Sequence, residues 1–170
     1  MTRNRSNIIL IGMPGAGKST IGVILAKLTS RAFVDTDLLI QASQGRSLQD
    51  IVDKEGHLAL RKIEEDVLVG LDCRNHVIAT GGSAAYSHAA MTHLQADGIV
   101  VFLDVDLATL EARVSDYSTR GLAKRPDQSF ADLFAERFSP YTRYADFTVH
   151  CSDMTHEEVC QAIMDELRTR

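Results

Sequence analysis

Residues 7–19 of the chain read NIILIGMPGAGKS. The apolar run over 7–11 is typical of a strand that is buried on both faces of a parallel sheet. The next residues match the pattern G-x-x-x-x-G-K-[ST], and the apolar spacing after it predicts an amphipathic helix over 18–30. Backbone N–H groups of such a loop point inward at the positive end of a helix and bind phosphate groups. The residues predicted to bind a nucleoside triphosphate are Gly12, Gly15, Ala16, Gly17, Lys18, Ser19 and Thr20.

Two side chains of this loop have separate expected roles. The ammonium group of Lys18 can reach the β- and γ-phosphates, and the hydroxyl group of Ser19 can ligate Mg²⁺. We therefore expect Mg²⁺ as the cofactor and ATP as the phosphoryl donor.

Outside this stretch, short apolar runs alternate with segments of helical periodicity. Further strands are predicted at 32–35, 76–80, 98–103 and 147–150, and further helices at 58–71, 106–114 and 155–167. Strands separated by helices form βαβ units, so we predict a three-layer α/β fold, a central parallel sheet covered by helices on both faces, in a single domain over 1–170. Ligands of such sheets bind beyond the carboxyl ends of the strands. Functional residues are therefore expected just after Ile11, Val34, Ala79 and Leu103.

The composition excludes several classes of protein. The chain has 170 residues, with 18 Lys and Arg against 23 Asp and Glu and a formal net charge of −5. This length suits one domain, and the lack of a basic excess argues against a dedicated nucleic-acid binder. An odd number of cysteines without a CxxC pair suits reduced thiols, and the N-terminal apolar run is too short for a signal peptide or a membrane span. We expect a cytoplasmic monomer that binds small molecules and neither nucleic acid nor membrane.

Two aspartates follow the second predicted strand, in the sequence Asp35-Thr36-Asp37. Side chains two apart on an extended chain point the same way, so both carboxylates are expected to face the phosphate loop. One would organise the waters of Mg²⁺, and the other would accept a hydrogen bond from a substrate hydroxyl and help remove its proton. The alternative is a turn in which an aspartate only accepts hydrogen bonds from backbone N–H groups. The neighbouring phosphate loop favours the catalytic interpretation.

Arg61 and Glu64 lie one turn apart on the predicted helix 58–71, so their side chains are expected to meet. Two interpretations are open. The pair is a surface ion pair that contributes less than ~1 kcal/mol, or Glu64 fixes Arg61 for bidentate recognition of a substrate carboxylate. After the strand at 76–80, Gly81 and Gly82 permit the close approach of a ligand to the backbone, with a simple tight turn as the alternative.

Residues 115–129 form a polar stretch that contains Arg120, Lys124 and Arg125. Its length and charge suit a mobile lid that brings cations onto the transferring phosphate, and a solvated loop is the alternative. Arg137 lies in a helix expected to begin near Ser129 and, taken alone, would pass as a surface arginine.

Taken together, these motifs resemble those of the shikimate kinase family, small single-domain members of the P-loop kinases. The phosphate loop occurs in many unrelated ATPases, but the order and spacing of the other motifs are much more specific. The resemblance runs from Ile8 to the last helix. It rests on GMPGAGKST at 12–20, DTD at 35–37, Arg61 with Glu64, ATGG at 79–82 and ERFSPYTRYAD at 136–146.

The resemblance implies a fold like that of the nucleoside-monophosphate kinases, with a mobile lid at about 115–129 and a substrate-binding helical region at about 37–64. The implied activity is ATP-dependent phosphorylation of the 3-hydroxyl of shikimate, in aromatic amino-acid biosynthesis. Asp35 corresponds to the family's Mg²⁺-linked acid, alongside Ser19.

For the nucleotide, the resemblance implies that Lys18 and one lid arginine neutralise the transferring phosphate. Arg120 is the first choice because it comes early in the lid, and Arg125 is the alternative. Arg113 matches an arginine that lies against adenine, and Ser152 falls in the family's adenine-contacting loop.

For the acceptor, the resemblance assigns Asp37 to the ring hydroxyls, beside the hydroxyl that is phosphorylated. Arg61 and Arg137 resemble the two arginines that grip the shikimate carboxylate. Gly81 and Gly82 match the backbone contact to the substrate.

Three positions depart from the family pattern. Ser83 stands where a third glycine is usual, Leu60 where a phenylalanine is usual, and Arg125-Pro126 leads into Asp127-Gln128 instead of leucines. These departures suit a divergent shikimate kinase or a kinase of another small acceptor, such as gluconate or a nucleoside monophosphate. A regulatory switch that hydrolyses nucleotide slowly is a different class, and the DTD motif with Arg61 and Arg137 argues against it.

Overall fold

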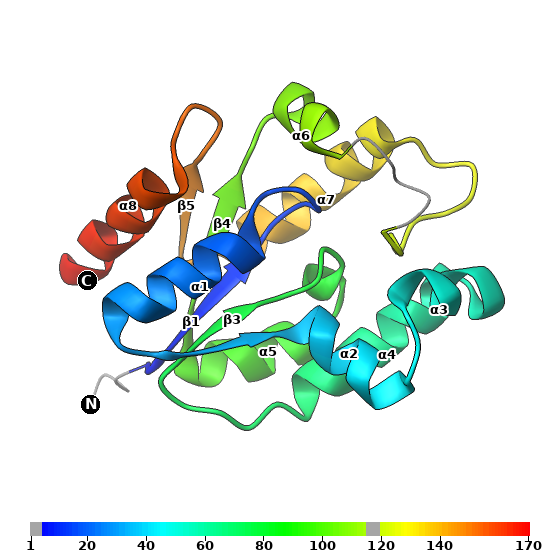
Figure 1. Cartoon of the computed structure of the whole chain (residues 1–170), viewed down its shortest axis with the longest axis horizontal. Coiled ribbons are helices and arrows are strands. Elements are labelled where there is room, and N and C mark those ends of the chain that lie inside the picture. The colour runs from blue at the N-terminus through cyan, green and yellow to red at the C-terminus, as the bar shows by residue number, and fades with distance from the viewer. Residues whose placement is uncertain (1–4, 115–119) are drawn as a thin grey trace.

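The structure is a computed structural model that describes residues 5–114 and 120–170. Five parallel strands form one sheet in the order β2-β3-β1-β4-β5 (Figure 1). The strands are β1 (Asn7–Ile11), β2 (Ala32–Asp35), β3 (His76–Ala79), β4 (Gly98–Asp104) and β5 (Phe147–His150). The parallel sheet predicted from the sequence is thus confirmed.

Helices lie on both faces of this sheet, α1 and α8 on one and α5 and α7 on the other (Figure 1). The helices are α1 (Lys18–Thr29), α2 (Thr36–Gln44), α3 (Leu48–Glu55), α4 (His57–Val69), α5 (His88–Asp97), α6 (Leu107–Arg113), α7 (Phe130–Tyr144) and α8 (His156–Arg168), with a short 3₁₀ helix η1 (Ala84–Tyr86). The predicted helices correspond to α1, α4, α6, α7 and α8, whereas α5 was not predicted. Within the described ranges, no helix is both long enough and apolar enough to cross a bilayer.

Capping side chains explain where several helices begin. Asp106 precedes α6 and accepts a hydrogen bond from the N–H of Thr109, at 2.9 Å. Thr155 and Glu158 form a reciprocal capping box at the start of α8. These caps satisfy backbone N–H groups that would otherwise have no partner in the first helical turn.

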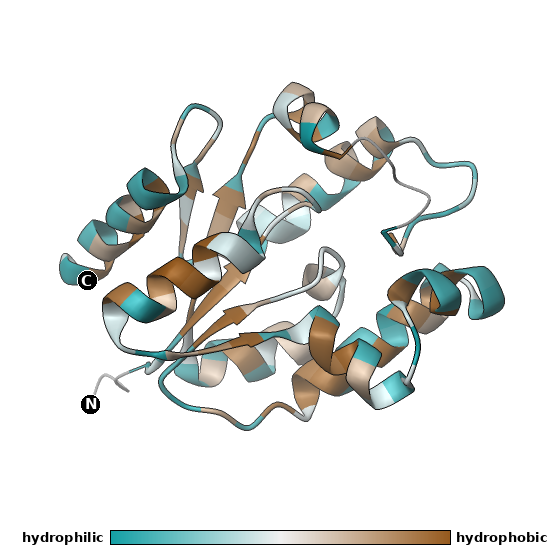
Figure 2. Ribbon diagram, in the orientation of Figure 1, coloured by the Kyte–Doolittle hydropathy of each residue, from teal (hydrophilic) through white to brown (hydrophobic). Residues whose placement is uncertain are grey.

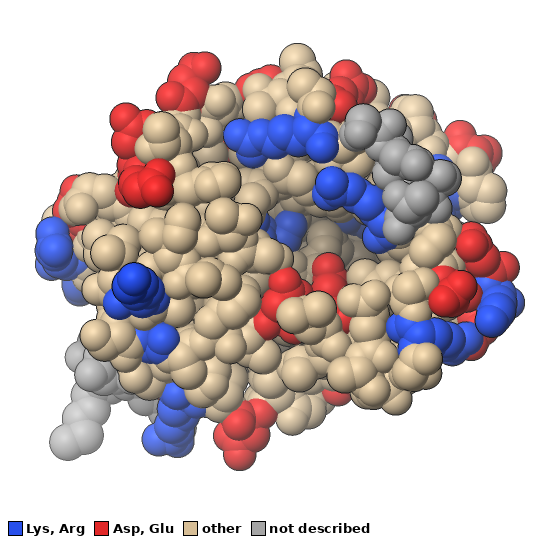
Figure 3. Space-filling model, in the orientation of Figure 1, with Lys and Arg blue, Asp and Glu red and all other residues tan. Residues whose placement is uncertain are grey.

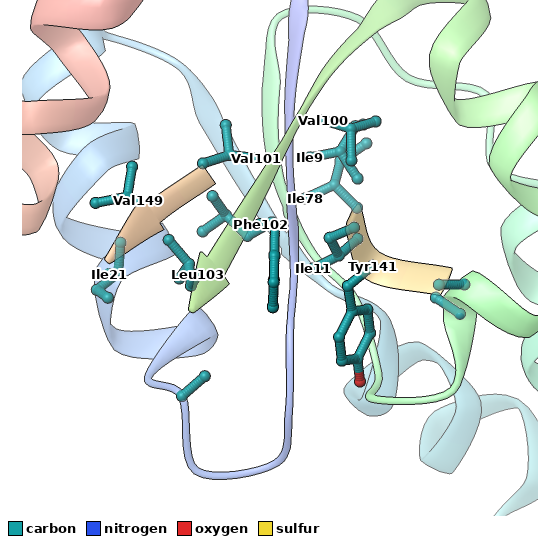
Figure 4. Close-up of a cluster of buried hydrophobic side chains, with 14 of the residues drawn as sticks. Ile9, Ile11, Ile21, Ile78, Val100, Val101, Phe102, Leu103, Tyr141 and Val149 are labelled. Carbon is teal, nitrogen blue, oxygen red and sulfur yellow. The ribbon is translucent and has the colours of Figure 1, made fainter. Parts of the chain in front are cut away.

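The main core lies between the sheet and its two helical layers. Figure 2 shows apolar residues along the central strands and polar residues on the outer helix surfaces. Val101 and Leu103 of β4 lie on the face covered by Ile21 of α1 (Figure 4). On the other face, the ring of Phe102 packs against Tyr141 of α7, with 5.1 Å between the ring centroids. Both faces of β4 are therefore buried, which its continuous apolar sequence predicted.

A second, smaller core joins α2, α3 and α4 beside the β2 edge of the sheet. It consists of Ile40, Ile51, Leu60 and Ala123. Ala123 belongs to the expected lid, so the described part of the lid packs on the same apolar cluster as the expected substrate-binding helices. This small core positions α4 and the lid residues over the carboxyl ends of the strands.

Candidate functional site

Two joined pockets open at the carboxyl ends of the strands, and Pro14, Asp37, Arg120 and Leu122 line both. The inner pocket, defined by Asp37, Glu64, Gly81, Gly82 and Arg137, encloses about 440 Å³ of non-protein space. The outer pocket lies over the phosphate loop, defined by Gly15, Gly17, Lys18, Ser19 and Arg113, and encloses about 1000 Å³. Figure 3 shows this face hollowed, with basic groups above the hollow and acidic groups below it. Both pockets are concave sites of the kind that small-molecule ligands occupy.

The phosphate loop after β1 needs glycine at two positions where a side chain would be strained. Gly15 has φ +85°, and a Cβ there would lie 2.6 Å from a methyl carbon of Val114. Gly17 has φ +91° and forms the N-cap of α1 without a capping side chain. The first turn of α1 therefore presents free backbone N–H groups to the outer pocket, as an anion site requires.

Lys18 is buried and folds back over its own loop. Its Nζ donates hydrogen bonds to the carbonyl oxygens of Gly12, at 2.7 Å, and Met13, at 2.9 Å. Burial lowers the pKa of Lys18 to about 8, against the opposing attraction of Asp37. A phosphate in the outer pocket would offer this ammonium group a stronger partner than two carbonyl oxygens.

Asp35 and Asp37 lie beside the phosphate loop, but the predicted reason for this arrangement was wrong. Asp35 ends β2 and caps α2, because its Oδ1 accepts the N–H of Asp37 at 2.9 Å. Asp37 is consequently in the first turn of a helix and not on extended chain. The other oxygen of Asp35, Oδ2, accepts a hydrogen bond from the Ser19 hydroxyl at 2.5 Å. Asp35 thus combines the capping role and the loop-facing role that the sequence left as alternatives.

Ser19 and Asp35 fit a magnesium site in their chemistry. A hydroxyl and a carboxylate are hard oxygen donors, and Mg²⁺ is usually held by one or two such groups together with phosphate oxygens and waters. Their contact at 2.5 Å already brings the two oxygens to one point beside the phosphate loop.

Glu64 of α4 is buried in the wall of the inner pocket, at 4% exposure. The Ser83 hydroxyl donates a hydrogen bond to its Oε2, and its Oε1 has no partner within the described part of the chain. Burial raises the pKa of Glu64 to about 7, although the Ser83 hydrogen bond acts in the opposite direction. Burial also raises the pKa of Asp37, with Lys18 opposing. A Cβ on Gly81 would collide with both carboxyl groups, which is why glycine stands there.

Arg137 of α7 is the buried cation of the inner pocket, at 1% exposure. Its Nη2 donates to the carbonyl oxygen of Ala123 at 3.0 Å, and its Nη1 lies against Gly82, where a Cβ would be 2.5 Å away. The Tyr141 hydroxyl donates to the carbonyl oxygen of Gly82 and fixes this turn from the α7 side. The glycine pair therefore allows the close approach of the site's own side chains to the backbone.

Arg61 does not pair with Glu64, so the predicted contact between them was wrong. Among the described residues, Arg61 forms an ion pair with Glu136, with Nη2 3.8 Å from Oε1. Its guanidinium carbon lies 3.7 Å from the ring centroid of Tyr86. Glu64 points inward to Ser83, whereas Arg61 extends toward η1 and α7 and lines a small neighbouring pocket instead of the inner one.

The two candidate lid arginines lie in different surroundings. Arg120 lines both pockets. Arg125 forms ion pairs with Glu136 at 3.3 Å and with Asp127 at 3.9 Å. Residues 115–119 of the expected lid lie outside the described residues. This arrangement favours Arg120 as the arginine that meets a phosphate.

The expected adenine contacts are divided between two positions. Arg113 lines the outer pocket, and its Nη1 donates to the carbonyl oxygen of Gly15 at 3.2 Å. Ser152 is absent from the described lining of that pocket, and its hydroxyl oxygen accepts the N–H of Asp106 at 3.0 Å. His156, in the first turn of α8, lies beside Gly17, with Nε2 3.6 Å from where a Cβ would be.

Sequence reasoning assigned no role to three residues at the site, Tyr86, Glu136 and His156. Tyr86 follows the glycine pair by a few residues, and Glu136 directly precedes Arg137 in the quoted motif. The sequence positions of Tyr86 and Glu136, close to these motif residues, are signals that could have identified the two as site residues. Neither shows that Tyr86 and Glu136 contact Arg61, because that contact joins three separate elements.

Comparison with known proteins gives a consistent result along the whole chain. A family model described as shikimate kinase matches residues 14–168. A shikimate kinase of Vibrio campbellii is 35% identical over 169 residues, 98% of this chain and 98% of that protein. One of Caldanaerobacter subterraneus subsp. tengcongensis is 32% identical over 161 residues, 93% of this chain and 94% of that protein. The solved structure of shikimate kinase from Acinetobacter baumannii in complex with shikimate has a TM-score of 0.89 and 30% identity, covering 98% of this chain and 95% of that one.

Proposed function

The chain belongs to the shikimate kinase family, and we propose that its outer pocket binds ATP and its inner pocket binds shikimate. Its activity is shikimate kinase activity, the transfer of a phosphoryl group from ATP to shikimate. The observation that carries the division of the site is that Asp37 and Arg120 line both pockets. Phosphoryl transfer needs donor and acceptor to meet at one point, and these two residues mark it.

On the donor side, Lys18 leaves the carbonyl oxygens of its loop and binds the β- and γ-phosphates. Arg120 meets the γ-phosphoryl group from the opposite side, and Arg113 lies against the base. Ser19 and Asp35 would hold Mg²⁺, which neutralises charge on the phosphate oxygens when it is bound. Backbone N–H groups of the loop, already oriented, bind the phosphates without reorganisation.

On the acceptor side, the buried guanidinium group of Arg137 and the backbone at Gly81 and Gly82 hold the shikimate carboxylate and ring. Asp37 accepts a hydrogen bond from the 3-hydroxyl and takes its proton as the oxygen attacks the γ-phosphorus. The bond from that phosphorus to the β–γ bridging oxygen breaks, and ADP leaves with the electron pair. The single buried cation in the described lining of the inner pocket supports a carboxylated acceptor.

The direct test offers purified protein Mg-ATP with shikimate, gluconate and a nucleoside monophosphate in separate reactions. Of the three acceptors, we expect only shikimate to give ADP release. Phosphorus NMR of the product should show the phosphate on the 3-hydroxyl. Phosphorylation of gluconate or of the nucleotide in preference to shikimate would overturn the assignment of the inner pocket.

The first variant is Asp37→Asn, which keeps the size of the side chain but removes its basicity. We expect turnover to fall by at least about 100-fold, because proton removal in the transition state contributes factors of this order. Calorimetric binding of shikimate should change by less than about 5-fold. Asp66→Asn, at an exposed ion pair of α4, is the matched control and should leave turnover unchanged. Near-normal turnover of Asp37→Asn would remove this residue from proton transfer.

A further inference from the structure

Tyr86, the last residue of η1, lies against two arginines, Arg137 of the inner pocket and Arg61 of the small neighbouring pocket. The guanidinium carbon of Arg61, on α4, is 3.7 Å from the centroid of the Tyr86 ring. The guanidinium carbon of Arg137, on α7, is 5.4 Å from the same centroid. One aromatic ring therefore contacts both cations, within the range in which the ring attracts a positive charge.

The ring of Tyr86 is itself held in place by Glu136. The Tyr86 hydroxyl donates a hydrogen bond to Oε1 of Glu136, at 2.5 Å. The other oxygen of Glu136 accepts from Gln128 Nε2 at 2.7 Å and from Arg125 Nη1 at 3.3 Å. This carboxylate is thus anchored by lid residues on one side and fixes the tyrosine on the other.

Arg61 depends on the ring more than on its ion pair. Its Nη2 is 3.8 Å from Glu136, which is beyond hydrogen-bond distance, and its buried Nε has no partner among the residues the structure describes. A flexible arginine with one long ion pair is poorly oriented, because the pair restrains distance more than direction. Stacking on a fixed ring defines the plane of the guanidinium group.

Only a short distance separates Arg61 from the inner pocket. Ser83 lines the inner pocket and also the small neighbouring pocket that Arg61 and Tyr86 line. Ser83 is therefore the residue at which the two spaces meet. Arg137 lines the inner pocket and also faces the Tyr86 ring, so a carboxylate bound to it would lie near this boundary.

We propose that Tyr86 is a positioning residue for acceptor recognition: its ring orients Arg61 beside Arg137 so that both arginines act on the carboxylate of shikimate. The proposal rests on the proposed function, since it takes shikimate to be the acceptor of the inner pocket. The aromatic face carries the effect, and the hydroxyl group serves to keep that face in place.

The experiment compares Tyr86→Leu with Tyr86→Phe, using shikimate and its uncharged methyl ester as probes. Tyr86→Leu removes the ring, so the KM for shikimate should rise about 10-fold, within the range that a cation–π contact provides. The KM for ATP and the inhibition constant of the ester should stay within about 2-fold. Tyr86→Phe keeps the ring, and its KM for shikimate should stay within about 3-fold. Phe138→Leu, which removes a half-exposed ring elsewhere on α7, is the control and should leave all three constants unchanged.

A double-mutant cycle adds a test that partial unfolding cannot imitate. In an Arg61→Ala background, Tyr86→Leu should raise the KM for shikimate no further, because the residue it positions is gone. Additive effects in this cycle, or equal losses for shikimate and the ester, would overturn the proposal. Equal damage from Tyr86→Phe and Tyr86→Leu would overturn the role of the ring. Absence of phosphoryl transfer to shikimate by the unaltered protein would instead overturn the proposed function, and this is measured first.

Discussion

Glu64 shows how far the environment of one side chain can change its chemistry. Its position one turn from Arg61 predicts a partner of that arginine, either on the surface or at a substrate site, whereas the structure buries it against Ser83 and raises its pKa to about 7. Burial disfavours the charged carboxylate, so the folded protein holds a proton here that a solvated glutamate would release. Glu64 therefore gives the inner pocket a carboxyl group whose pKa lies near neutrality.

The stability of the protein should therefore depend on pH through Glu64. Its pKa rises from 4.5 to about 7 on folding, so its contribution is complete below about pH 4.5 and is lost as the pH rises through about 7. The loss is about 3 kcal/mol. Glu64→Gln, which imitates the protonated group, should be more stable than the unaltered protein at about pH 8 and similar to it at about pH 4.5. Urea unfolding at the two pH values measures the difference.

Glu65→Gln is the control for this titration. The pKa of Glu65 is lowered by its hydrogen bonds to Lys62 and Ser87, so its effect has the opposite sign. Its contribution is present at neutral pH and is lost on acidification. An unchanged pH dependence in Glu64→Gln would show that the burial of this carboxyl group does not govern its titration.

At the scale of elements, hydrophobic periodicity predicted the buried central strands. It missed one helix with a weak apolar stripe and the start of another that a capping side chain determines. The continuous apolar runs of β1 and β4 identified central strands, because both faces of these strands are buried. Helix α5 was missed because its buried positions are Ala90, Met91 and Leu94, a weak stripe with small residues. The extended geometry predicted for Asp37 was wrong because Asp35 caps a helix, which spacing alone does not reveal.

Helix α3 and the described part of the lid meet at Gly121, and this contact makes a prediction about acceptor binding. The N–H of Gly121 donates to Oε1 of Gln49 at 2.8 Å, and a Cβ on Gly121 would collide with Leu48 and lie 2.6 Å from the Gln49 nitrogen. Gly121→Ala should therefore displace the lid residues from α3 and lower kcat/KM for shikimate by about 10-fold. A strained left-handed alanine also costs roughly 1–2 kcal/mol of stability.

Gly45→Ala separates these two effects. Gly45 has φ +63°, nearly the same as the +61° of Gly121, but a Cβ there meets no described atom within 4 Å. It should lose similar stability in urea and keep its kcat/KM. If the two variants have the same kinetics, the contact between Gly121 and α3 has no part in acceptor binding.

At the scale of the whole molecule, the net charge does not describe the charge of the binding pockets. The net charge is −5, yet both ligands are anions. Lys18, Arg113, Arg120 and Arg137 line the two pockets. Figure 3 shows basic groups above the hollow and acidic groups below it, with charges of both signs elsewhere on this face. Composition could predict that binding must be local. It could not predict that Arg61 would contact Tyr86, because residues from three elements define that place.

At the opposite end of the sheet, an ion pair joins Arg5 and Asp146. Both oxygens of Asp146 accept hydrogen bonds from Arg5 at 2.9 Å, and one also accepts the N–H of Val100 at 2.8 Å. This carboxylate joins the N-terminal segment to the beginnings of β4 and β5. Asp146→Asn should lower the free energy of unfolding by about 2 kcal/mol, because charge-assisted hydrogen bonds are lost, and should leave kcat/KM unchanged.

Urea unfolding and steady-state kinetics check this prediction together. Asp165→Asn, which removes an exposed ion pair with Arg168, should change stability by less than ~0.5 kcal/mol. A fall in kcat/KM for Asp146→Asn would mean that the two ends of the sheet are coupled.

The residues that line the two pockets are distributed differently along the sequence. The phosphate-binding residues lie mainly in one contiguous stretch, 12–19. The inner pocket takes Pro14 from that stretch and the rest of its lining from the segments 37–48, 60–64, 81–83 and 120–137. A mutation in any one of those segments can alter acceptor choice while the phosphate loop passes unchanged to descendants. New acceptor specificities can therefore evolve on this fold in small steps, without reinvention of phosphoryl chemistry.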